Sequence, residues 1–62
     1  MINALRAKYK ADIAAADATI NIYFNNSVGI GKHPQLLEEL DKLLAKIAEA
    51  KDKLEALEDF NG

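Results

Sequence analysis

The clearest hydrophobic pattern of the chain lies in its second half. Apolar residues follow one another there at alternating intervals of four and three positions. This spacing places them on one side of an α-helix, as in helices that pack lengthwise against a neighbour. The pattern therefore predicts a helix over residues 34–59. Its buried stripe is expected to contain Leu36, Leu40, Leu43, Ile47, Ala50, Leu54 and Leu57.

Two further leucines widen this stripe at the start of the helix. Leu37 and Leu44 each follow a stripe residue directly and stand seven positions apart. A two-stranded coiled coil needs only the narrow stripe, so the wider one predicts burial against more than one neighbour.

A less regular pattern predicts a first helix over residues 2–24. Its apolar stripe consists of Ile2, Leu5, Tyr9, Ile13, Ala16, Ile20 and Tyr23, with Phe24 beside the last. A second row, built almost wholly of alanines from Ala4 to Ala18 and ending at Ile22, runs along an adjacent side. This row indicates either helix propensity alone or a close contact with another helix.

Residues 25–33 separate the two predicted helices. Asparagine and glycine tolerate the left-handed conformation that often ends a helix, and proline is favoured in the first turn of the next. Asn25 and Pro34 therefore mark the ends of the break. The sequence predicts one all-α domain over residues 1–62, an antiparallel two-helix hairpin with helix 2–24, loop 25–33 and helix 34–59.

The position of the break also predicts which residues lie opposite each other. In an antiparallel hairpin that turns near residue 29 or 30, the numbers of facing residues add up to about 59. This register would turn Asp12 and Thr19 inward, so Ile13 and Ile20 are expected to take their places. The expected pairs include Leu5 with Leu54, Tyr9 with Ala50 and Ala16 with Leu43.

Two helices alone cannot cover both stripes. A chain of 62 residues buries only about 60% of the surface that its unfolded form exposes, and without cysteine it has no disulfide to compensate. We therefore expect a homo-oligomer, most simply two hairpins that form a four-helix bundle with twofold symmetry. The residues expected in the core and in self-association are Leu5, Tyr9, Ile13, Ala16, Ile20, Leu36, Leu40, Leu43, Ile47, Leu54 and Leu57.

The composition narrows the class of protein further. Half of the residues are apolar and 29% are charged, which is typical of a folded helical protein. No apolar run approaches the roughly 18 residues of a membrane span, and the first residues lack the layout of a signal peptide. We expect a cytoplasmic protein with no membrane partner.

The search for catalytic chemistry finds little. The segment Gly29–Lys32 has the glycines of a phosphate loop, but Asn26 and His33 stand where that motif needs glycine and serine or threonine. His33 has no cysteine or second histidine with which to share a metal. We expect no enzyme activity, no catalytic residue, no cofactor and no metal.

Nucleic-acid binding is the alternative function. The predicted layout and length are similar to those of the plasmid RNA-binding regulator ROP, with no motif in common. Arg6, Lys8 and Lys10 form the one basic cluster, within a half of the chain that carries +2, whereas residues 34–62 carry −4. An overall isoelectric point near 5.2 opposes phosphate affinity, so nucleic acid is not the expected partner.

The predicted loop contains two apolar residues, Val28 and Ile30. A turn needs neither of them for its geometry. They are expected either to fold back over Tyr23, Phe24 and Leu37 and close the end of the bundle, or to stay exposed as a contact for a host protein. Both alternatives make them candidate contact residues.

One stretch of the sequence resembles a known group. Residues 22–34 and the run Lys46–Leu54 resemble short helical proteins encoded by large tailed phages of marine cyanobacteria, over residues 8–57. That group has an acidic residue where this chain has Lys32. The resemblance implies a phage accessory protein in the cytoplasm of a bacterial host. With the patterns above, we expect it to act through protein–protein interaction and self-association.

Overall fold

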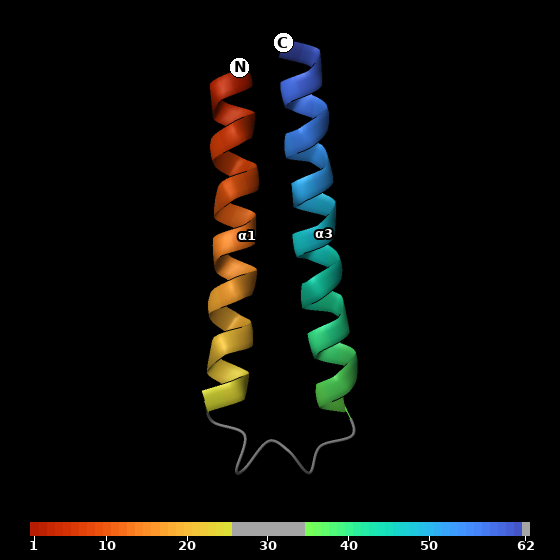
Figure 1. Cartoon of the computed structure of the whole chain (residues 1–62). Coiled ribbons are helices and arrows are strands. Elements are labelled where there is room, and N and C mark those ends of the chain that lie inside the picture. Colours follow the sequence, from red (N-terminus) through yellow and green to blue (C-terminus); the bar gives the residue numbers. More distant parts are fainter. Residues whose placement is uncertain (26–34, 62) are drawn as a thin grey trace.

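The computed structural model describes residues 1–25 and 35–61. These residues form two helices, α1 (Ile2–Asn25) and α3 (Gln35–Asn61), and contain no strand. The helices run antiparallel side by side (Figure 1). The described part of the chain is therefore the expected all-α helical hairpin.

Local sequence explains why both segments are helical. Neither helix contains glycine or proline, and α1 is rich in alanine, the best helix former. Glu38 lies in the first turn of α3, where an acidic side chain complements the partial positive charge of the helix start. The helices extend one residue past the predicted end at 24 and two past the end at 59, which is within the one or two residues by which assigned helix ends commonly differ.

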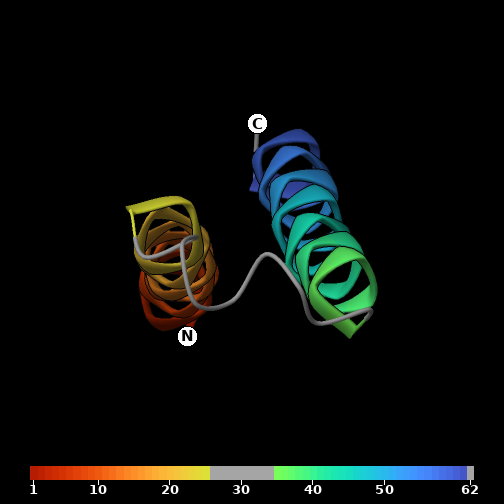
Figure 2. The same cartoon turned by 90° about the horizontal axis from the view of Figure 1, so that it is seen from below.

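The hairpin is long and narrow. Its Cα atoms extend over 46 × 15 × 13 Å, and their radius of gyration is 14.4 Å, against about 10.6 Å for a compact domain of the same length. Both chain termini lie at one end, here called the terminal end, and the other end, where α1 ends and α3 begins, is called the connection end (Figure 1). Figure 2 looks along the helices and shows them inclined to each other.

The interior of the hairpin is thin. Ala16 and Ala50 are each 4% exposed and Ile20 is 9% exposed, and they are the buried apolar residues of the described chain. No large side chain there is fully buried. The two helices approach each other closely enough to bury two alanines, and the larger side chains around these remain half-covered.

The exposed surface is correspondingly large. The accessible area is 4852 Å², whereas a folded monomer of 6.8 kDa typically exposes about 3,950 Å². The excess is therefore about 900 Å². A single hairpin thus leaves about as much surface uncovered as one partner contributes to an interface of standard size, roughly 800 Å².

Candidate self-association surface

The residues predicted for the core lie along the line where the two helices meet, which we call the seam. Tyr9 and Ala50 line one groove of this seam, and so do Ala16 and Leu43, as expected for facing pairs. Ala16 and Ile20 are buried. The other predicted core residues are half-buried: Leu5, Tyr9, Ile13, Leu36, Leu40, Leu43, Ile47, Leu54 and Leu57.

The structure also shows how the two polar positions near the seam are accommodated. Asp12 is exposed and forms an ion pair with Lys8, with 2.8 Å between Oδ2 and Nζ. Thr19 is half-buried, and its hydroxyl donates a hydrogen bond of 2.9 Å to the carbonyl oxygen of Ala15. Ile20 turns inward instead, so the seam stays apolar at this level.

Grooves open on the two sides of the seam, and their chemistry differs. On both helices, residues that directly precede a seam residue face one side, and residues that directly follow a seam residue face the other. We call the first the polar groove. It is lined by Tyr9, Asp12, Ala15, Ala16, Thr19, Leu43, Lys46, Glu49, Ala50 and Lys53.

Charged side chains cover the polar groove. Lys53 and Lys8 lie 5.6 and 6.0 Å from the centre of the Tyr9 ring, within the range of cation–π attraction. Lys53 also forms an ion pair of 3.1 Å with Glu49. The hydrogen bond to Asp12, and then the charge of Asp12, raise the pKa of Lys8 above its ordinary value. These groups are exposed, so this side is suited to contact with water.

The groove on the opposite side lies near the connection end, and we call it the apolar groove. Its volume is about 300 Å³, and Asp41 is the only charged residue in its lining. Phe24, Leu37 and Leu44 are 64%, 77% and 58% exposed there. The full lining is Ile20, Phe24, Leu37, Leu40, Asp41 and Leu44.

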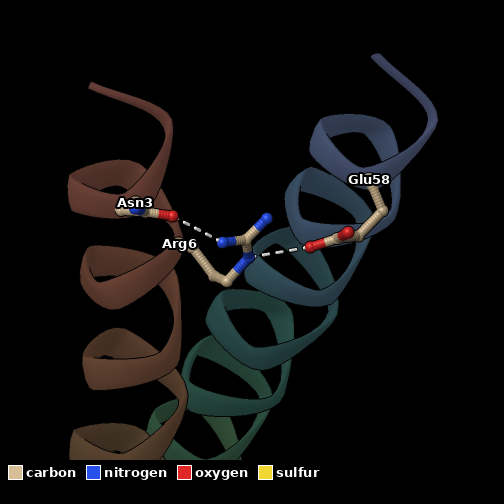
Figure 3. Close-up of polar contacts among 3 residues, drawn as sticks. All are labelled: Asn3, Arg6 and Glu58. Atoms are coloured by element: carbon tan, nitrogen blue, oxygen red, sulfur yellow. Dashed lines mark hydrogen bonds and ion pairs between the residues drawn. The ribbon is translucent and has the colours of Figure 1, made fainter. Parts of the chain in front are cut away.

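The same side of the hairpin is charged at the terminal end. Arg6 and Glu58 directly follow the seam residues Leu5 and Leu57. Arg6 Nε donates a hydrogen bond of 2.8 Å to Glu58 Oε1, and Arg6 Nη1 donates one of 2.8 Å to Asn3 Oδ1 (Figure 3). An ion pair of this exposure typically contributes less than about 1 kcal/mol. It therefore orients the helix ends more than it stabilises them.

The basic cluster of the sequence is divided between the two sides of the seam. Arg6 is bound to Glu58 on the side of the apolar groove, whereas Lys8 is bound to Asp12 on the side of the polar groove. Side chains two positions apart on a helix do not face each other, and those four apart do. Lys10 therefore lies on the side of Arg6, and Lys8 lies apart from both.

Several residues singled out in the sequence lie outside the described residues. These are the candidate contact residues Val28 and Ile30, the glycine-containing segment Gly29–Lys32, and His33. Within residues 1–25 and 35–61, no group of three or more acidic or histidine side chains is placed to hold a metal ion. Neither described helix is both long and apolar enough to cross a membrane.

The apolar groove combines Leu37 and Leu44, which widen the stripe of the second helix, with Phe24, which was expected near Leu37 at the end of the bundle. Another feature of the surface, Phe60, was not singled out from the sequence. Phe60 is 90% exposed and lies beside Tyr9 at the terminal end of the polar-groove side. Phe60 belongs to neither apolar stripe, so the spacing of apolar residues does not predict that it contributes to the surface. No protein-family model, curated protein or solved structure matches the chain.

Proposed function

We propose that this protein is a non-enzymatic interaction protein that works as a self-associated bundle, most simply two hairpins in a four-helix arrangement. The observation that carries the proposal is the thin interior of the single hairpin. Among residues 1–25 and 35–60, Ile20 is the one large buried side chain, whereas six large apolar residues are more than half exposed. They are Met1, Ile22, Phe24, Leu37, Leu44 and Phe60.

Energetic considerations support association. Burial of apolar area contributes about 25 cal/mol per Å², and small domains need most of it to offset the conformational entropy of folding. With half-buried seam residues and no disulfide, one hairpin lacks the usual means by which small domains fold. A second copy of the chain supplies additional buried apolar area, with no need for a disulfide.

The resemblance to helical phage proteins supports a setting for this activity. In this proposal the bundle acts in the cytoplasm of an infected bacterium, as an accessory protein that binds itself and a host protein. The described residues expose large apolar side chains, which are available for contact with another protein, and the formal charge of the chain is only −2.

The RNA-binding alternative has less support. It needs a common basic surface, but Arg6 and Lys8 lie on opposite sides and both are paired with acids. Phosphate-driven binding weakens steeply with salt. We therefore expect no salt-dependent retention of RNA by the purified protein at low ionic strength. Retention at 50 mM salt that disappears at higher salt would favour the alternative.

Sedimentation equilibrium tests the proposal. The expected mass is twice the 6.8 kDa of one chain at micromolar concentration, with helical content that falls as the dimer dissociates on dilution. A fully helical species that sediments as a monomer over the same range would contradict it.

A further inference from the structure

We infer that the apolar groove is covered by the same groove of a second copy, and that the two hairpins lie parallel, with both connection ends together. This inference rests on the proposed self-association and adds the surface and the arrangement. In this dimer, α1 of each copy packs against α3 of its partner.

The first argument is the contrast between the two sides of the seam. The polar groove has five charged residues in or beside it: Lys8, Asp12, Glu49 and Lys53 form ion pairs, and Lys46 also lines the groove. The apolar groove exposes Phe24, Leu37 and Leu44 around the buried Ile20. A second hairpin placed on this side continues the existing core from Ile20 outward at the connection end, and at the terminal end it lies over charged residues that include the Arg6–Glu58 ion pair.

The area supports a partner of this size. The hairpin exposes about 900 Å² more than a typical folded monomer of its mass. A stable interface of standard size takes roughly 800 Å² from each partner. One long side of a hairpin whose Cα atoms extend over 46 × 15 Å is large enough to provide this area. A short peptide in the groove would leave most of the side uncovered.

The distribution of residues along this side selects the parallel arrangement. On α3, residues at intervals of seven change from apolar at the connection end to charged at the terminal end: Leu37, Leu44, Lys51 and Glu58. On α1, Phe24 at the connection end is the one large apolar residue that follows a seam position; the others, toward the terminal end, are Asn21, Asp17, Ala14, Lys10, Arg6 and Asn3. Parallel hairpins therefore place the apolar ends on each other. Fully overlapping antiparallel hairpins would place Phe24 and Leu37 over the Arg6–Glu58 ion pair.

The charges of the two helices favour the same arrangement. The residues of α1 include three basic and two acidic side chains, and those of α3 include four basic and eight acidic ones, which gives +1 and −4. A twofold axis along the hairpin brings each α1 beside the partner's α3. A twofold axis across the hairpin brings α3 beside α3, and like charges at close range are repelled.

Distance measurement between spin labels tests the arrangement. The chain has no cysteine, so Asn25→Cys, at the exposed end of α1, carries one label per copy. We expect a separation well below half of the 46 Å length of the hairpin. Ala11→Cys, near the middle of α1 and two positions from the seam residues on either side of it, is the control and gives a short separation in either arrangement. A dimer whose Asn25 labels lie nearly one hairpin length apart would overturn the inference while leaving self-association intact.

A matched pair of substitutions tests the surface. Leu44 and Ile22 are both 58% exposed, but Leu44 lines the apolar groove and Ile22 does not. We expect Leu44→Ser to weaken the dimer at least about tenfold, because two leucines lose their burial, and Ile22→Ser to weaken it less than about threefold.

Each other outcome contradicts the inference in a distinct way. A dimer weakened by Ile22→Ser and not by Leu44→Ser would assign the contact to the alanine row of α1. Loss of stability by Leu44→Ser in a protein that is monomeric throughout would assign the groove to the chain's own residues 26–34. That second result would also refute the proposed self-association, whereas the first would not.

Discussion

Replacing Ile20 with alanine is expected to lower the free energy of unfolding by about 2–5 kcal/mol. Ile20 is 9% exposed and lies where the seam meets the apolar groove, beside Leu40. Removing it leaves a cavity among side chains that are themselves only half-buried. Small domains typically have about 5–15 kcal/mol of stability in total, so the loss would be a large part of it. Urea denaturation followed by circular dichroism measures the change.

The matched control for this substitution is Ile22→Ala. Ile22 stands on the same helix two positions away and is 58% exposed. Alanine is the better helix former, so this change is expected to shift the free energy of unfolding by no more than about 0.5 kcal/mol. Equal losses from the two substitutions would show that Ile20 is not the centre of the core.

Enlarging Ala16 to leucine is expected to have the second large effect. Ala16 is 4% exposed and lines a groove together with Leu43, the residue expected to face it on α3. A leucine there has no room and must separate the helices, which typically costs about 1–3 kcal/mol. Thermal denaturation should show a lower melting temperature with an unchanged helical spectrum at low temperature.

Ala11→Leu is the control for the added bulk of leucine. Ala11 is exposed and stands two positions from the seam residues Tyr9 and Ile13, so leucine there meets neither α3 nor the apolar-groove side. The melting temperature of this variant is expected to stay within a few degrees of the wild-type value. If Ala16→Leu were as stable as Ala11→Leu, the close approach of the two helices at Ala16 would be wrong.

Much of the hairpin could be predicted from the sequence because its signals are local. The 4, 3 spacing from Leu36 to Leu57 and the break at residues 25–33 predict two helices and their direction. The register follows from the position of the break alone. The inward turn of Ile20 in place of Thr19 also follows, because the 3.6-residue turn drifts from a seven-residue repeat.

The degree of burial could not be predicted in the same way. Leu43 and Ile47 stand at the centre of the strongest stripe, and the sequence predicts them to be the least replaceable residues. In the hairpin they are half-buried, whereas Ala16 and Ala50 are buried. Periodicity identifies the side of a helix that is covered. How far each side chain is covered depends on the distance between the helices and on what packs over them, and neither is encoded in spacing.

The candidate self-association surface could likewise be predicted from the sequence only in part. Leu37 and Leu44 widen the stripe visibly in the sequence and indicate a second neighbour. Phe24 joins them only because the antiparallel register brings the end of α1 beside the start of α3. A surface to which two helices contribute can thus be recognised only when the register of one helix against the other is known. The difference between the apolar and polar grooves then follows from the residues on each side of the seam.

The central claim is that this chain completes its core by self-association, so that folding depends on protein concentration. Thermal denaturation at two concentrations a hundredfold apart tests it most directly. If the folded species is a dimer, mass action contributes about 2.7 kcal/mol over this range. For two chains of 62 residues that corresponds to a melting temperature about 10 °C higher at the higher concentration. A cooperative transition at the same temperature at both concentrations would contradict the claim.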